Sequence, residues 1–254
     1  MCNPIIKFGV FPSKAKQMGL VFDKFATGHY VRCEFDENNQ EFVLKRAIDL
    51  KKDQSYFLYG LSQDVLKNVI FPLGSMTKEQ TREYAAKNNI PVATKQDSQD
   101  FYSGSYSDLF ECEKNCGDIV DIHGNILGRH NGLCNYTIGQ RKGLLIAYSE
   151  PLYVVGFDTK QNRLIVSTKD NTYSNGLFAS CASWISNIIP DKAFEAQIKI
   201  RSAQQPFECI VYPQDGNKLK IEFLIPQSSV APGQAVVIYH NDTVLGGATI
   251  DSSY

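Results

Sequence analysis

The spacing of apolar residues changes near residue 104. Before this point, aromatic and β-branched runs at residues 22–32 and 42–48 predict strands. Apolar positions at helical spacing over residues 51–69 predict a helix there, with Ser62 as a candidate N-cap for a second short helix. Strands that alternate with helices indicate an α/β layer.

A capping box predicts where the next helix begins. Thr77 is followed three residues later by Gln80, so each side chain can accept a hydrogen bond from the other residue's backbone N–H. The helix is expected to end near Asn88 and Asn89, before Pro91.

Beyond residue 104 the helical periodicity is lost and short alternating strands such as residues 219–224 follow, so this half is expected to be all β. The sequences His123-Gly124-Asn125 and Asp215-Gly216-Asn217 are turn signals between such strands. The segment Thr172–Asn175 is the candidate boundary between two β domains. The expected organisation is an incomplete α/β domain, a small middle β-rich domain and a C-terminal β barrel, over residues 1–104, 105–174 and 175–254.

The composition is that of a globular chain with a sizeable core. Of 254 residues, 43% are hydrophobic and 21% charged, which suits two or three domains. The net charge of -1 gives no overall cationic field, so a nucleic-acid site would have to be a local patch. No run has the length of a membrane span, no signal-peptide layout is present, and the seven scattered cysteines are expected to be thiols. We therefore expect a cytoplasmic protein.

The segment Tyr136–Leu144 describes a tight cationic loop between two apolar runs. Glycines at both ends allow positive φ and close approach to a partner, and Arg and Lys suit a phosphate. An ordinary solvated turn is the alternative interpretation. Arg129 is a further candidate phosphate contact, chosen by charge and loop context. The candidate RNA contacts within the loop are Gln140, Arg141 and Lys142.

Three other motifs precede this loop: Ala26-Thr27-Gly28-His29-Tyr30, the segment Lys52–Tyr59, and Asp97-Ser98-Gln99-Asp100. In this order the four motifs resemble the tRNA-specific 2-thiouridylases, which use ATP to replace the C2 oxygen of the wobble uridine of certain tRNAs with sulfur. The resemblance extends from Cys2 to almost the last residue. It implies a tRNA-uridine 2-sulfurtransferase whose partners are tRNA and a persulfide sulfur donor, and whose cofactor is ATP with Mg.

The family's phosphate-binding loop, Ser-Gly-Gly-x-Asp-Ser, lies before the point that matches the start of this sequence. The one Gly-Gly pair here, Gly246-Gly247, falls between apolar residues of a probable strand, where a phosphate loop cannot be built. The resemblance therefore implies the remnant of a nucleotide-binding, adenine nucleotide alpha hydrolase-like α/β domain. A separate N-terminal ATP-binding segment would be a further partner.

The resemblance also assigns the two catalytic positions. The sequence Cys2–Phe8 matches the family's Cys-Asn-x-x-Ile-Lys-Phe and places Cys2 on the nucleophile, where Lys7 would favour the thiolate. Alternatively, Cys2 is a frayed terminal residue. Tyr102 occupies the position of the family's persulfide cysteine, and a phenol cannot form a persulfide.

Cys112 and Cys116 follow in a C-x3-C arrangement. Three interpretations are open: the two cysteines replace the sulfur carrier at a displaced position, they bind a metal, for which this spacing is weak support, or they are two ordinary thiols.

The binding positions are better retained. The resemblance places Gly28 against the nucleotide and assigns tRNA contacts to His29, Lys52, Asp53, Gln54, Arg201, Ser202 and Gln234. Local chemistry offers other interpretations: a polar strand end for His29, the solvated first turn of a helix for residues 52–54, and a turn before a strand for Gln234. Ser202 replaces a family tyrosine, so a stacking ring is missing there.

Three functions follow: a 2-thiouridylase that is incomplete as this chain, a non-catalytic tRNA-binding relative, and a structural β-domain protein. Tyr102 favours the second or a branch that works with one cysteine. An in-frame Ser-Gly-Gly-x-Asp-Ser upstream of Met1 would favour the first.

Overall fold

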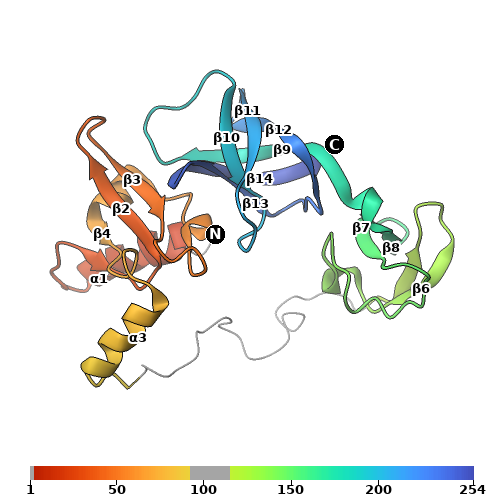
Figure 1. The fold of residues 1–254 in the computed structure, drawn as a ribbon, viewed down its shortest axis with the longest axis horizontal. Helices are drawn as coiled ribbons and strands as arrows, with labels where there is room; N and C mark the ends of the chain where they lie inside the picture. The colour runs from red at the N-terminus through yellow and green to blue at the C-terminus, as the bar shows by residue number, and fades with distance from the viewer. Residues whose placement is uncertain (1–2, 92–114) are drawn as a thin grey trace. The chain divides into compact units, whose positions relative to one another are not determined.

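The computed structural model describes residues 3–91 and 115–254 (Figure 1). Two compact units make up the chain. The first contains Met1–Lys95, Phe178–Ile221 and Gln234–Ile250, and the second contains Gln96–Leu177, Glu222–Gly233 and Asp251–Tyr254. No helix among the described residues is both long enough and apolar enough to cross a membrane.

The N-terminal segment mixes short helices and strands, as expected of an α/β layer. Strands β1 and β4 pair in parallel, with Phe25 opposite Val69. Its elements are η1 (Asn3–Val10), α1 (Phe11–Gln17), β1 (Phe25–Ala26), β2 (Val31–Asp36), β3 (Glu41–Arg46), η2 (Ser55–Phe57), α2 (Gln63–Asn68), β4 (Val69–Ile70) and α3 (Lys78–Lys87).

The capping box at α3 is confirmed. The Thr77 hydroxyl accepts from Gln80 N at 3.2 Å, and the Gln80 amide oxygen accepts from Thr77 N at 2.8 Å. The helix ends at Lys87, with Asn88 as its C-cap, as the sequence predicted.

The predicted helix over residues 51–69 is wrong. The chain makes the single 3-10 turn η2, then the short helix α2, and then strand β4. Tyr56 and Leu58 are buried in the core, but they reach it from an irregular backbone. That backbone is fixed by Asp53, whose carboxylate accepts from Ala47 N and Ser55 N at 3.1 and 3.2 Å. Ser62 does hold the N-cap position of α2, without a side-chain capping bond.

The predicted strand over residues 22–32 is also wrong as one element. It is split into β1 and β2 by an irregular stretch, in which the buried Thr27 hydroxyl bonds the buried His29 ring at 2.9 Å. The helices η1 and α1 at the N-terminus were not predicted, because most of their apolar residues, such as Ile5 and Phe11, face solvent.

The second unit contains a four-stranded sheet in the order β6-β5-β8-β7. The turn at His123-Gly124-Asn125 is confirmed, since Asp121 Oδ1 accepts from His123 N and Asn125 N, both at 2.9 Å. The elements of this region are β5 (Gly117–Val120), β6 (Ile126–His130), η4 (Leu133–Asn135), β7 (Tyr153–Asp158), β8 (Arg163–Ser167) and η5 (Lys169–Thr172).

The C-terminal strands close into a barrel, as expected. Strand β13 pairs with both β10 and β14, which completes a ring in the order β13-β10-β11-β12-β9-β14. The turn at Asp215-Gly216-Asn217 joins β11 to β12, and Gly216 and Asn217 both have positive φ. The barrel strands are β9 (Tyr173–Trp184), β10 (Phe194–Lys199), β11 (Phe207–Gln214), β12 (Lys218–Ser228), β13 (Ala235–His240) and β14 (Thr243–Ser253).

The N-terminal segment and the barrel strands of the first unit share one sheet and one core. Strand β3 pairs with β14, with Thr243 opposite Lys45 and Val244 opposite Leu44, so hairpin β2–β3 extends the barrel sheet. Leu44, Leu58 and Leu66 are buried in the same cluster as Val237 and Tyr239 of β13. Burial of this shared apolar surface is the main force that holds the unit together.

Candidate functional site

Gly28 lies at the edge of the β1–β4 pair where nucleotides usually bind. It follows the carboxyl end of β1 and is exposed. A Cβ added to it would meet Leu73 Cδ1 at an ordinary 3.7 Å, and its φ is not positive. The fold itself therefore does not require glycine here. In open α/β sheets, ligands bind at the carboxyl ends of the parallel strands. The position of Gly28 is therefore suited to close contact with a nucleotide.

His29 is turned into the protein. Its side chain lies 5.6 Å from the Phe8 ring and 6.1 Å from the Phe71 ring, measured between centroids. Burial, together with the charge of Lys7, lowers the pKa of His29 from 6.5 to about 4. The ring is therefore neutral near pH 7 and belongs to the core in this structure, and its contact with tRNA stays a prediction.

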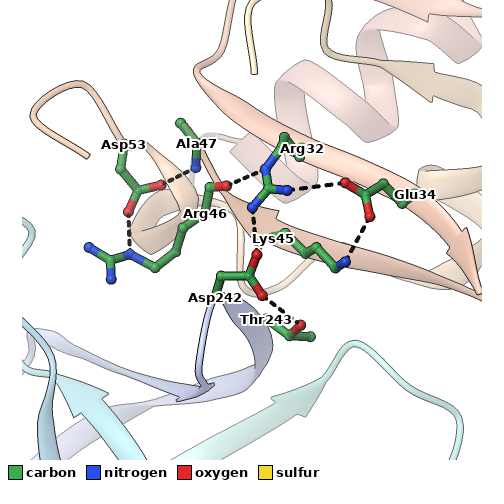
Figure 2. Close-up of polar contacts among 8 residues, drawn as sticks. All are labelled: Arg32, Glu34, Lys45, Arg46, Ala47, Asp53, Asp242 and Thr243. Atoms are coloured by element: carbon green, nitrogen blue, oxygen red, sulfur yellow. Dashed lines mark hydrogen bonds and ion pairs between the residues drawn. The ribbon is translucent and has the colours of Figure 1, made fainter. Parts of the chain in front are cut away.

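Asp53 is the centre of a buried ionic cluster, and Figure 2 shows its contacts with Arg46 and Ala47. Its side chain is 1% exposed and accepts from the Ser55 hydroxyl at 2.9 Å, in addition to the two backbone N–H groups. Its Oδ2 lies 3.4 Å from Arg46 Nε and 4.0 Å from Lys199 Nζ. The interpretation of Asp53 as part of a solvated helical turn is therefore wrong, because its carboxylate organises the interior.

Lys199 brings a buried cation to this cluster from strand β10. Its side chain is 4% exposed, and its Nζ lies 5.9 Å from the centre of the Tyr56 ring. Burial lowers the pKa of Lys199, while the charge of Asp53 opposes that shift. Sequence reasoning missed Lys199 and Arg46, because their shared partner is brought to them only by the tertiary fold.

A second polar group ties hairpin β2–β3 to the turn between β13 and β14 (Figure 2). Arg32 donates to Asp242 and to Glu34, and its Nε donates to the carbonyl of Arg46 at 2.9 Å. Lys45 pairs with the same Glu34 at 2.7 Å. These side chains are more exposed than Asp53, so their ion pairs contribute less to stability.

Tyr56 brings three of the predicted tRNA segments into one neighbourhood. It lies beside residues 52–54, and its hydroxyl donates to the carbonyl of Ala235, the neighbour of Gln234, at 2.7 Å. Burial raises the pKa of Tyr56 to about 12, with the charge of Tyr59 raising it further and that of Arg201 lowering it. Arg201 is therefore close enough to act on the Tyr56 phenol.

The side chains of this neighbourhood differ in exposure. Arg201, Ser202 and Gln234 are exposed and Lys52 is half-buried. Gln54 accepts from Tyr30 N at 3.0 Å through its side-chain oxygen. The surface can thus present Arg201, Ser202 and Gln234 to a ligand, while the side chains of Asp53 and Gln54 are engaged with backbone N–H groups.

The cationic loop of the second unit is a tight turn, as predicted. Gly139 and Gly143 both have φ of 82°. Gln140 accepts from Thr137 N at 3.0 Å and donates to the Lys142 carbonyl at 2.9 Å, so it braces the loop from within. Arg141 and Lys142 are exposed. The loop therefore holds two outward cations on a braced backbone.

Several predicted residues cannot be placed. Cys2, Tyr102, Cys112 and the motif at Asp97–Asp100 lie outside the described residues, and their roles stay predictions. Cys116 is exposed. Within residues 3–91 and 115–254, no group of three or more His, Cys, Asp or Glu side chains is arranged to hold a metal ion.

A cavity of about 710 Å³ in the first unit is unsuited to RNA. It lies beside hairpin β2–β3 and is lined by aromatic and aliphatic side chains, with Lys45 and His240 as its basic residues. Its acidic lining residues would repel phosphates. These are Glu34, Asp36, Glu37, Glu41 and Glu195.

Comparison with family models matches almost the whole chain. A "tRNA methyl transferase HUP domain" matches residues 1–102, a "tRNA methyl transferase PRC-barrel domain" matches residues 111–168, and an "Aminomethyltransferase beta-barrel domain" matches residues 174–250.

Individual relatives are similar over the same extent. The "tRNA-specific 2-thiouridylase MnmA" of Endomicrobium trichonymphae is 49% identical over 251 residues, which cover 98% of this chain and 70% of the relative. The protein of the same name from Synechocystis is 42% identical, covering 98% and 71%. "tRNA-specific 2-thiouridylase MnmA 1" of Caldanaerobacter subterraneus is 41% identical, covering 98% and 70%.

Proposed function

Because this chain belongs to the family of tRNA-specific 2-thiouridylases, we propose that it takes part in the ATP-dependent 2-thiolation of the wobble uridine of tRNA. The observation that carries this proposal is the gathering of three predicted tRNA segments around Tyr56. Residues 52–54, Arg201 with Ser202, and Gln234 are distant in sequence, yet they form one neighbourhood in the first unit.

The charge of this neighbourhood suits RNA. Arg46 and Lys199 lie beside Asp53, and Lys199 and Arg201 act on Tyr56, so the described contacts gather three cations and the carboxylate of Asp53. Arg201 is exposed and can pair with a phosphate through its planar guanidinium. Asp53 keeps the two buried cations in place, so it acts on RNA binding as a positioning residue.

We propose that ATP binds at the edge beside Gly28, which is exposed and follows the carboxyl end of β1. ATP would supply adenylation, which converts the uridine oxygen into a leaving group. Binding the phosphates needs a cradle of N–H groups or cations. We propose that this cradle is formed outside residues 3–91 and 115–254. Gly246-Gly247 does not form it, because both glycines lie inside β14 against Ser183, Val236 and the Tyr59 ring.

For sulfur transfer, the sequence supports two proposals. In the first, Cys2, Cys112 or Cys116 carries the sulfur, since the phenol of Tyr102 cannot. In the second, the chain is a non-catalytic relative that holds tRNA through the Tyr56 neighbourhood and the cationic loop. Retained binding positions beside a substituted catalytic one favour the second proposal.

Both proposals are tested by one reaction. The chain is incubated with tRNA, ATP, Mg and a persulfide donor, and tRNA nucleosides are then identified by mass spectrometry. ATP-dependent 2-thiouridine supports the enzyme, and single replacement of each cysteine then identifies the carrier. tRNA binding without product supports the non-catalytic relative. Absence of tRNA binding at low salt would overturn both.

If residue 102 is the vacant carrier position, Tyr102→Cys should acquire a labile sulfur from the persulfide donor, whereas Tyr102→Ser should not. Cyanolysis measures that sulfur directly and does not depend on tRNA turnover. Equal labelling of the two variants would contradict the proposed position.

A further inference from the structure

The second unit contains a hollow of about 570 Å³ beside the cationic loop. It is bordered by the end of β6, by η4 and by residues 143–145. Its volume is within the range of small-ligand sites, about 300–1,000 Å³. Among the described residues that line it there is no carboxylate, and Arg129 contributes an exposed guanidinium. The hollow is therefore suited to a ligand that carries negative charge.

One wall of the hollow is an aromatic ring held in place by a fixed histidine. The Tyr136 ring lies 6.0 Å from the His130 ring at an angle of 74°. His130 is 2% exposed, accepts from Gly132 N at 3.1 Å through Nδ1, and reaches the Asn162 carbonyl at 3.0 Å through Nε2. Because Nδ1 accepts a hydrogen bond, Nε2 is the nitrogen that donates to the Asn162 carbonyl. These two bonds fix His130, which supports the Tyr136 ring.

Two asparagine side chains next to the Tyr136 ring provide one hydrogen-bond donor and one acceptor for a ligand. Asn131 Oδ1 accepts from the Tyr136 hydroxyl at 3.2 Å, and Asn135 Nδ2 donates to the Asn131 carbonyl at 3.0 Å. Within the described part of the chain, Asn131 Nδ2 and Asn135 Oδ1 have no partner. A planar face beside such groups is the pattern by which proteins hold unstacked RNA bases.

Leu145 stands at the rim of the hollow in a conformation that leucine rarely adopts. Its φ is 54° and its side chain is 99% exposed. Positive φ costs free energy for a residue with a branched side chain, and such costs are concentrated at functional sites. The brace formed by Gln140 and the bond from Gly139 N to the Val154 carbonyl, 2.7 Å, hold the loop in this shape.

We propose that this hollow receives one unstacked nucleotide of the bound tRNA. Arg129 pairs with its phosphate, its base stacks on Tyr136, and Asn131 and Asn135 contact the base edge. Leu145 covers the ribose from the rim. The inference rests on the proposed function, since the ligand is the same tRNA, but it adds a second contact site in a different unit from the Tyr56 neighbourhood.

The test is fluorescence anisotropy of labelled tRNA titrated with the full chain over a series of salt concentrations. Arg129→Gln should reduce the slope of log K against log salt by about 0.7–0.9, the value for one lost phosphate contact. Tyr136→Leu should weaken binding about tenfold, as expected for loss of one stacked base. Tyr136→Phe, which keeps the ring, should bind nearly as the unmodified chain does.

Lys169→Gln is the matched control for charge, since Lys169 is exposed in the same unit and does not line the hollow. It should leave the slope unchanged. If Arg129→Gln and Tyr136→Leu bind as the unmodified chain does, the hollow is not a nucleotide site, while the proposed function stands. If the unmodified chain does not bind tRNA, both are overturned. Should Tyr136→Leu fail to fold, Arg129→Gln decides alone, because Arg129 is a surface residue.

Discussion

Replacing Asp53 by Asn would remove one charge from the buried cluster and change little in shape. The carboxylate now accepts three hydrogen bonds, from Ala47 N, Ser55 N and the Ser55 hydroxyl, and faces Arg46 and Lys199. In Asp53→Asn, Lys199 would keep its charge at 4% exposure with no carboxylate beside it among the described contacts. Removing one partner of a buried ion pair costs about 3–5 kcal/mol.

We expect the lower end of that range, about 3 kcal/mol, because Arg46 retains 13% exposure and can be partly hydrated. For chains of this size, that loss corresponds to a fall in melting temperature of about 6–12 °C. The assay is thermal and urea denaturation followed by circular dichroism. Asp242→Asn is the matched control: its pair with Arg32 has side chains 49% and 21% exposed. It should cost less than about 1 kcal/mol.

The double variant Asp53→Asn with Lys199→Met separates the charge from the hydrogen bonds. Because Met removes the stranded charge, the double variant should be at least about 1 kcal/mol more stable than the sum of the two single losses predicts. An Asp53→Asn variant no less stable than Asp242→Asn, or strictly additive effects, would refute the argument from the buried cluster.

Four further variants change single residues. The folded pKa of His29, about 4, lies below its unfolded value of 6.5. The unfolded chain therefore binds more protons between these values, so stability should fall by up to about 3 kcal/mol as pH drops from 6.5 to 4. His29→Gln should remove that part of the pH dependence in urea titrations, and an unchanged slope would contradict it. Gly247→Ala should cost about 1–3 kcal/mol by overpacking, because its Cβ would lie 2.6 Å from Val236 O. Gly28→Ala should change stability by less than about 0.5 kcal/mol. It should nevertheless weaken ATP binding, which calorimetry measures. Equal melting temperatures of Gly247→Ala and Gly28→Ala would refute the packing argument. Gln140→Ala should cost about 1 kcal/mol and weaken tRNA binding without changing its salt slope, whereas a smaller slope would show that Gln140 acts through phosphate.

Sequence patterns predicted the features that depend on neighbouring residues. The capping box of Thr77 and Gln80 and the glycine-bounded loop at Gly139–Gly143 both place their partners within a few residues of one another. The order of an α/β layer followed by β domains was also predictable, since the spacing of apolar residues changes once along the chain.

The buried cluster could not be predicted in the same way. Asp53 looked like the solvated start of a helix, because its partners Arg46 and Lys199 come from β3 and β10. The apolar spacing over residues 51–69 was misleading for a related reason. Tyr56, Leu58 and Leu66 all reach the core, but from a backbone shaped by hydrogen bonds to a buried carboxylate. Periodicity reports which side chains are buried, and a tertiary partner decides the backbone that carries them.

The pairing of β3 with β14 has a consequence for synthesis on the ribosome. Hairpin β2–β3 leaves the ribosome well before β14, the strand that covers its edge with Thr243 opposite Lys45. Until then Leu44 lacks its neighbour Val244, and an open strand edge invites pairing with other chains. We expect the nascent protein to depend on chaperones between the synthesis of β3 and that of β14, and fragments that end before β14 to aggregate.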